Sequence, residues 1–147
     1  MTDAPRPAPV PASERTVLIV DDDEDILTLL EVLIHRDGFQ ILTAATAAHA
    51  LKLLEEGPQA IVLDLILPGS ADGFSVLETV EKLPFPPAVV VVTGSPNAAD
   101  LARARKSPCV KTVLKKPLRQ NDLLGALHQA LGTVPAPARR TPPPEVP

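Results

Sequence analysis

The chain has 147 residues, a formal net charge of −4 and a single cysteine. This length fits one domain with short extensions. The small negative charge argues against a nucleic-acid binder, which would carry a basic patch. One cysteine allows neither an internal disulfide nor a cysteine-bound zinc site. The sequence shows neither a signal peptide nor an apolar run long enough to span a membrane, so we expect a cytoplasmic protein.

Both ends of the chain are rich in proline and alanine. Residues 1–14 and 133–147 together hold more than half of the 18 prolines. Such segments favour extended, solvated backbone. We therefore expect flexible tails at residues 1–14 and 133–147, on either side of a folded domain at residues 15–132.

Strand and helix patterns alternate between the tails. Short runs rich in Val, Ile and Leu predict strands, and apolar residues three or four positions apart predict helices. The expected strands are residues 16–20, 40–44, 60–63, 88–92 and 110–114. The expected helices are residues 24–36, 47–56, 74–83, 98–106 and 120–131.

Five successive strand–helix units predict an α/β fold. The strands lack polar alternation, which is typical of a parallel sheet buried on both faces. Because crossover connections are right-handed, few topologies remain. We expect a flavodoxin-like, doubly wound (βα)5 sandwich with a parallel five-stranded sheet in the order 2-1-3-4-5.

Polar residues follow the expected strands at the edge where a ligand site would form. Asp21 and Asp22 follow the first strand and Asp64 follows the third, so this strand order brings the three carboxylates together. Clustered carboxylates repel one another, and a divalent cation that prefers oxygen ligands, such as Mg²⁺, Ca²⁺ or Mn²⁺, relieves the repulsion. Thr93 and Lys116 follow the fourth and fifth strands. A carboxylate, a metal, a hydroxyl and an ammonium suit phosphoryl transfer.

Four segments carry a family resemblance. VLIVDDDEDI, IVLDLILPG, VVVVTG and VLKKP resemble, in order and spacing, the receiver domain of two-component response regulators, of the stand-alone single-domain type. The resemblance covers residues 16–132. It implies that Asp64 accepts a phosphoryl group and that Thr93 and Lys116 contact that group. It also implies a cis peptide bond between Lys116 and Pro117.

The resemblance further implies a bound metal ion. Mg²⁺, for which Mn²⁺ can substitute, would be held by Asp21, Asp22 and Asp64 together with the backbone carbonyl of Ile66. These are oxygen ligands, as both ions prefer.

The function implied by the resemblance is that of a phosphorylated signalling protein. The expected donor is a sensor histidine kinase or a histidine phosphotransfer protein. The expected output is contact with a downstream protein through residues 98–131, or passage of the phosphoryl group onward. The chain would catalyse only its own phosphorylation and dephosphorylation, and neither nucleic acid nor a membrane is an expected partner.

The sequence departs from the family pattern at the output side of the domain. Val113 occupies the position, three residues before the lysine, where the family usually carries Tyr or Phe. Valine is stiff at χ1 and too short to replace an aromatic ring that turns inward on activation. We therefore do not expect this chain to couple phosphorylation to its output surface through the inward turn of an aromatic ring, as the family usually does.

Two alternatives fit part of the same pattern. One is a Mg²⁺-dependent phosphohydrolase of the haloacid-dehalogenase type, whose strand-end D-x-D motif is formally met by Asp21 and Asp23. The other is a receiver-like adaptor that acts without phosphorylation. The three histidines, His35, His49 and His128, lie on expected helices away from the polar rim, and we expect them on the surface.

Overall fold

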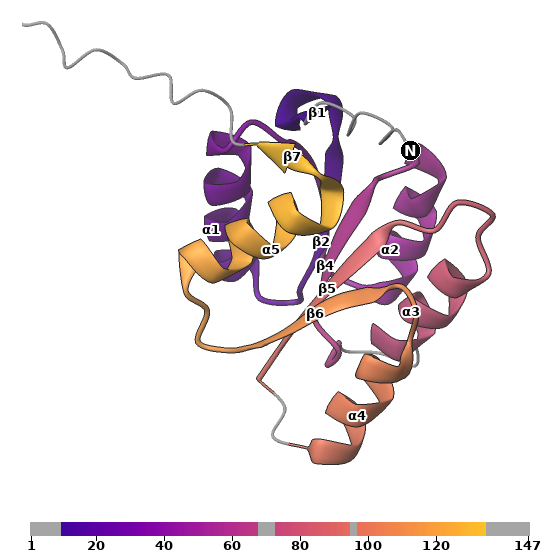
Figure 1. Cartoon of the computed structure of the whole chain (residues 1–147). Helices are drawn as coiled ribbons and strands as arrows, with labels where there is room; N and C mark the ends of the chain where they lie inside the picture. The colour runs from indigo at the N-terminus through magenta and orange to yellow at the C-terminus, as the bar shows by residue number, and fades with distance from the viewer. Residues whose placement is uncertain (1–9, 68–72, 95–96, 135–147) are drawn as a thin grey trace, which may run out of the picture.

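The computed structural model describes residues 10–67, 73–94 and 97–134, and its centre is a five-stranded parallel sheet (Figure 1). The strands stand in the order β3-β2-β4-β5-β6. Their bounds are β2 Thr16–Val20, β3 Gln40–Ala44, β4 Ala60–Leu63, β5 Ala88–Thr93 and β6 Val110–Lys115. Numbered among themselves, these strands follow the order 2-1-3-4-5, so the predicted doubly wound topology is confirmed.

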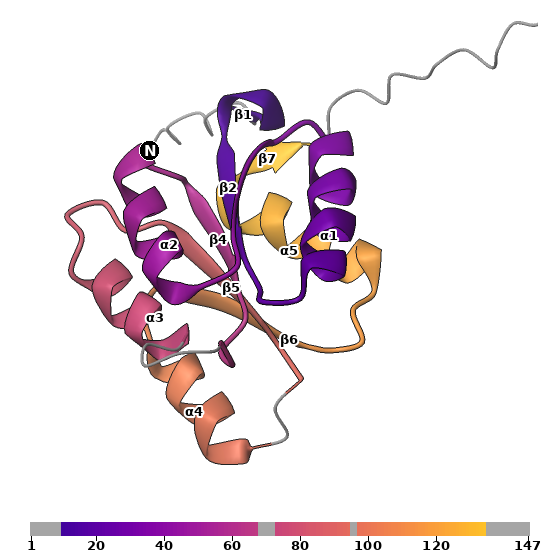
Figure 2. The same cartoon turned by 180° about the vertical axis from the view of Figure 1, so that it is seen from behind.

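Helices cover both faces of the sheet, which gives three layers. Figures 1 and 2 show α1 and α5 on one face and α2, α3 and α4 on the other. The bounds are α1 Glu24–Arg36, α2 Ala47–Leu53, α3 Gly73–Glu81, α4 Ala98–Lys106 and α5 Gln120–Leu131. The last turn of the second expected helix is a 3-10 turn, η2 Leu54–Glu56, which ends at Gly57 with φ of +71°. Glycine adopts this left-handed conformation without a steric cost.

The core is aliphatic and divided by the sheet into two halves. Along β2, Val17 and Ile19 pack with residues of α1 and α5, whereas Leu18 and Val20 pack with residues of α2, α3 and α4. Alternate side chains of a strand point to opposite faces, so an all-apolar strand serves both halves. The consecutive Val, Ile and Leu residues that predicted these strands are thus explained by burial on both sides.

The two ends of the folded part pair with each other. β1, Val10–Pro11, runs parallel to β7, Thr133–Val134, with Val10 opposite Thr133. Between β1 and β2, a 3-10 turn, η1 Ala12–Glu14, buries Ala12 in the core half under α1 and α5. Parts of both expected tails are therefore in regular structure, because extended backbone is also suited to strand pairing. The remaining tail residues lie outside the described residues.

The expectation that all three histidines are surface residues is wrong for His128. Its imidazole is half-buried, with Nε2 at 2.7 Å from Asp37 Oδ2 and Nδ1 at 2.7 Å from Thr133 Oγ1. The ring also stacks on Phe39, with centroids 4.8 Å apart. His128 follows the fully buried Leu127 on α5, and its contacts with Asp37, just past α1, and with Thr133 of β7 cover this side of the helix. His35 and His49 are exposed, as expected.

None of the helices in residues 10–67, 73–94 and 97–134 is both long enough and apolar enough to cross a membrane.

Candidate functional site

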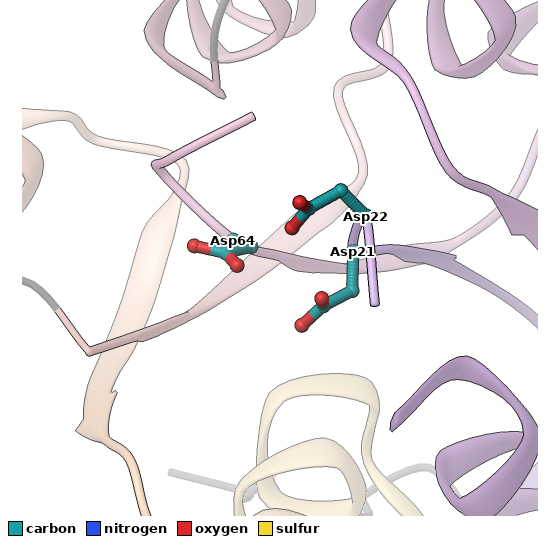
Figure 3. A group of neighbouring side chains, drawn as sticks. All are labelled: Asp21, Asp22 and Asp64. Atoms are coloured by element: carbon teal, nitrogen blue, oxygen red, sulfur yellow. The ribbon is translucent and has the colours of Figure 1, made fainter. Parts of the chain in front are cut away.

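The candidate site lies at the carboxyl ends of β2 and β4, where backbone pairing continues one residue past each strand. The Asp21 N–H donates to the Ala44 carbonyl at 3.1 Å, and the Asp64 N–H donates to the Val20 carbonyl at 3.0 Å. The last ladder bonds thus hold the backbone of both aspartates at neighbouring positions on the sheet edge. Figure 3 shows the carboxyl groups of Asp21, Asp22 and Asp64 gathered there.

The three carboxylates are close enough to share a ligand. One oxygen of each lies within 4.8 Å of the others. Asp21 and Asp64 are only 2 % and 5 % exposed, whereas Asp22 is exposed to solvent. The structure therefore brings together the three acids that the sequence placed on two separate strands.

Lys116, which follows β6, reaches across the sheet edge to both buried acids. Its Nζ lies 2.8 Å from Asp21 Oδ2 and 3.1 Å from Asp64 Oδ2. The second oxygen of each acid accepts a backbone N–H, from Asp23 to Asp21 Oδ1 and from Ile66 to Asp64 Oδ1, both at 2.9 Å. Each buried carboxylate is thus held by one lysine contact and one tight turn of its own backbone.

Burial and charge shift the pKa values of this group. Desolvation by burial raises the pKa of Asp64 above its usual value, and the Ile66 N–H and Lys116 only partly oppose it. For Lys116 desolvation works in the opposite direction, but the hydrogen bonds and charges of Asp21 and Asp64 prevail and raise the pKa. Lys116 is therefore a firmly charged ammonium beside a carboxylate that is costly to ionise.

The donor set fits a hard divalent cation. Three carboxyl groups meet a single ammonium at the site, and all the donor atoms of the cluster are oxygens. Magnesium takes few protein carboxylates and keeps several waters. The exposed Asp22 leaves the site open to such a hydrated ion.

A hollow of about 530 Å³ opens over the acids. Its lining residues are Asp22, Asp64, Ile66, Leu67, Gly94 and Lys116. Ile66 is 56 % exposed at its rim. A larger hollow of about 670 Å³, at the opposite edge of the sheet near Arg15 and Lys111, includes none of the three clustered acids.

Thr93 and the bond after Lys116 occupy the positions that the sequence assigned to them. Thr93 ends β5, is fully buried, and accepts a hydrogen bond at its carbonyl from the Lys116 N–H at 3.0 Å. The peptide bond between Lys116 and Pro117 is cis, as predicted. β5 and β6 thus bring Thr93 and Lys116 to the same edge as the acids.

The three other acids of the first motif, Asp23, Glu24 and Asp25, are not part of the acidic cluster. Asp23 caps α1, since its Oδ1 accepts the N–H groups of Asp25 at 2.9 Å and Ile26 at 3.2 Å. Asp25 is exposed in the first turn of α1. Acidic residues are favourable there because they face the positive end of the helix dipole.

Gly73 supports the site, although the motifs of the sequence do not single it out. It begins α3, and a Cβ placed on it would lie 2.4 Å from the backbone oxygen of Asp64 and 2.5 Å from the Cα of Leu65. The Gly73 N–H also donates to the Leu65 carbonyl at 3.2 Å. Only glycine permits this approach of one backbone to another. A glycine at the expected start of a helix, just after a functional loop, was the available signal.

The fold and the acidic edge together define a class: flavodoxin-like α/β domains with a cluster of carboxyl groups at the carboxyl ends of their strands. Comparison with known proteins then gives the family. Residues 17–128 match the model of the response regulator receiver domain. The chain belongs to this family.

Individual relatives agree with this assignment. The chain is 35 % identical over 117 residues to an NtrX-like response regulator from Rickettsia bellii, covering 78 % of this chain and 24 % of the relative. It is 43 % identical over 75 residues to the alkaline phosphatase synthesis transcriptional regulatory protein PhoP of Bacillus subtilis, covering 49 % of this chain and 31 % of PhoP. The chain thus spans about a quarter of the length of its NtrX-like relatives.

A solved structure shows the same arrangement. The CheY-like receiver domain protein from Methanospirillum hungatei is 27 % identical, with a TM-score of 0.74, and the match covers 80 % of this chain and 93 % of that one. The similarity therefore extends over nearly the whole of that domain.

Proposed function

We propose that this chain accepts a phosphoryl group on Asp64 from a phosphohistidine of a sensor histidine kinase or a histidine phosphotransfer protein. The observation that carries the proposal is the double contact of Lys116 with Asp21 and Asp64, on a chain that belongs to the receiver family. A fixed ammonium beside a nucleophilic carboxylate is suited to a reaction that brings a dianionic phosphoryl group to that carboxylate.

The transfer exchanges one bond to phosphorus for another. A carboxylate oxygen of Asp64 forms a bond to phosphorus while the bond from phosphorus to the donor's imidazole nitrogen breaks, and the imidazole keeps the electron pair. Lys116 neutralises charge on the phosphoryl oxygens, and Thr93 contributes its hydroxyl to one of them. The site holds its nucleophile in place before the donor arrives, because Asp64 Oδ1 is already fixed by the Ile66 N–H.

Asp21, Asp22, Asp64 and the backbone carbonyl of Ile66 would hold Mg²⁺, or Mn²⁺ in its place. When bound, the ion supplies positive charge that offsets the phosphoryl oxygens in the transition state. The protein catalyses only its own phosphorylation and dephosphorylation. It signals from the cytoplasm by protein contact through α4, β6 and α5, or passes the phosphoryl group onward.

The phosphohydrolase alternative is less well supported. It would use Asp21 and Asp23 as its D-x-D pair, but the side chain of Asp23 is engaged as the cap of α1. An unphosphorylated adaptor would have no use for the Lys116 contacts at the acidic cluster.

Labelling with a small phosphodonor tests the proposal. With Mg²⁺ and acetyl phosphate, the protein should gain one acid-stable, base-labile phosphoryl group. Asp64→Asn should abolish labelling, since an amide is not a competent nucleophile. Asp25→Asn is the matched control, because Asp25 is exposed on α1 and should leave labelling intact. Label that survives in Asp64→Asn, or moves to Asp21, would contradict the assignment.

A further inference from the structure

The link between α3 and α4 bears on the phosphoacceptor loop, defined as residues 64–67. In Figures 1 and 2 the two helices lie side by side on one face of the sheet. A hollow of about 300 Å³ opens between them, lined in part by Leu77, Glu81 and Lys106. Arg103 of α4 crosses toward α3 at this hollow and makes two contacts there.

Both contacts of Arg103 are with the first turns of α3. Its guanidinium lies over the Phe74 ring, 4.0 Å from the ring centroid, and its Nη2 lies 2.9 Å from Glu78 Oε2. Phe74 and Glu78 are four positions apart and so share one side of the helix. An arginine can stack on an aromatic face and bind a carboxylate at the same time, because its guanidinium is planar and carries several donors.

α3 begins against the backbone of the phosphoacceptor. Gly73 precedes Phe74 directly, lies in contact with the Asp64 carbonyl and donates its N–H to Leu65. Phe74 is 7 % exposed, so its ring is fixed by packing beneath the guanidinium. A shift of Phe74 would therefore move its neighbour Gly73, and with it the backbone of Asp64 and Leu65 that Gly73 contacts.

We propose that Arg103 is a positioning residue for the phosphoacceptor loop. By stacking on Phe74 it holds the first turn of α3 against Asp64 and Leu65, and this keeps the Ile66 N–H on Asp64 Oδ1. α4 is the helix that follows β5, which ends at Thr93. Arg103 therefore also connects the element that follows Thr93 with α3, which begins beside Asp64. This connection does not pass through residue 113, where the chain carries a half-buried valine.

The inference deepens the proposed function, but its first test does not depend on it. The measurement is amide hydrogen exchange of Ile66 in the metal-free full chain, which reports the hydrogen bond to Asp64 without any phosphodonor. Arg103→Ala should speed exchange at Ile66 roughly two- to five-fold, as expected for the loss of one exposed cation–π contact. Phe74→Leu, which keeps an apolar side chain but removes the π face, should act in the same direction.

Matched variants separate positioning from general stability. Arg105→Ala removes an exposed arginine from the same helix and should leave Ile66 unchanged. Arg103→Lys keeps a cation and should restore part of the protection, and Glu78→Gln should have a smaller effect than Arg103→Ala because exposed ion pairs contribute little. Equal exchange in Arg103→Ala and Arg105→Ala would overturn the proposal. Acceleration that includes the buried amide of Val90 would also overturn it, because the effect would then be one of overall stability.

Phosphorylation gives the second readout. In Arg103→Ala, the rate at saturating acetyl phosphate should fall by a similar factor, while the half-saturating concentration stays the same. A parent chain that takes no phosphoryl group would contradict the proposed function and leave the exchange result standing. An unchanged rate in Arg103→Ala beside faster Ile66 exchange would show that the loop position does not control the reaction, and would overturn the positioning role.

Discussion

The two edges of the sheet use polar residues in opposite ways. At the carboxyl edge, Lys116 contacts Asp21 and Asp64, and Asp22 adds a third carboxylate to the cluster, so negative charge is in excess. At the amino edge, Asp37 and Thr133 each engage one nitrogen of His128. Paired polar groups of this kind serve the fold, whereas an uncompensated cluster raises the energy of the unliganded protein and favours a ligand.

Substitution of Lys116 should have the largest effect on phosphorylation at the carboxyl edge. In Lys116→Met the phosphoryl oxygens lose their fixed positive charge, and the rate of labelling by acetyl phosphate should fall by about 100-fold or more. The neighbouring Lys115→Met, which removes an exposed ammonium, is the control. A rate within a few-fold of the parent in Lys116→Met would show that the metal alone stabilises the transferred group.

A matched pair of aspartate substitutions compares the edges directly. Asp37→Ala removes the partner of His128 Nε2 and should lower the free energy of unfolding by about 1–2 kcal/mol, as for a hydrogen bond to a side chain of this kind. Asp22→Ala removes one of three repelling carboxylates, so the metal-free protein should be no less stable than the parent. Urea unfolding of both variants without metal measures the difference.

For metal binding, the effects of Asp22→Ala and Asp37→Ala should be the opposite of their effects on stability. Asp22→Ala should weaken Mg²⁺ binding and slow phosphorylation, whereas Asp37→Ala should change neither. A clear loss of stability in metal-free Asp22→Ala would contradict this contrast, because it would assign Asp22 a structural contact.

The raised pKa of Asp64 should make the metal-free protein less stable as the pH rises. A carboxyl whose pKa is raised on folding binds its proton more tightly in the folded state, so it destabilises the fold as pH rises from the unfolded to the folded pKa. Asp64→Asn removes this cost. Without metal, the stability advantage of Asp64→Asn over the parent should therefore be larger at pH 7 than at pH 4, and an advantage that shrinks with pH would contradict the burial argument.

The smallest expected effect concerns the lifetime of the phosphoryl group. The family resemblance places Ile66 and Ser95, each two residues past a site residue, beside the water that hydrolyses the acyl phosphate; Ser95 lies outside the described residues. Neither side chain is a carboxylate or carboxamide that would orient water, so we expect a lifetime of minutes to hours. Ile66→Asn combined with Ser95→Glu should shorten it, as followed by loss of label. An unchanged decay would assign control of the water to other groups.

The sequence alone determined the sheet and its acidic edge. Runs such as VLIV and AIVL are apolar at every position, which suits only strands buried on both faces, and the carboxylates directly after them must then lie at the ligand edge. Asp21, Asp64 and Lys116 were predictable for the same reason, because strand order fixes which strand ends are neighbours. Asp23 directly precedes the expected helix at residues 24–36, and an acid at that position favours the cap that the structure shows.

The tertiary structure decided what depends on contacts between distant segments. Val10 and Thr133 pair although their composition indicates only extended backbone, and His128 is covered because the end of α1 packs beside α5. Arg103 on Phe74, and Gly73 on the Asp64 carbonyl, likewise depend on where α3 and α4 lie. Local periodicity shows which face of an element is apolar but not which neighbour lies against it, since that is set by the packing of the whole chain.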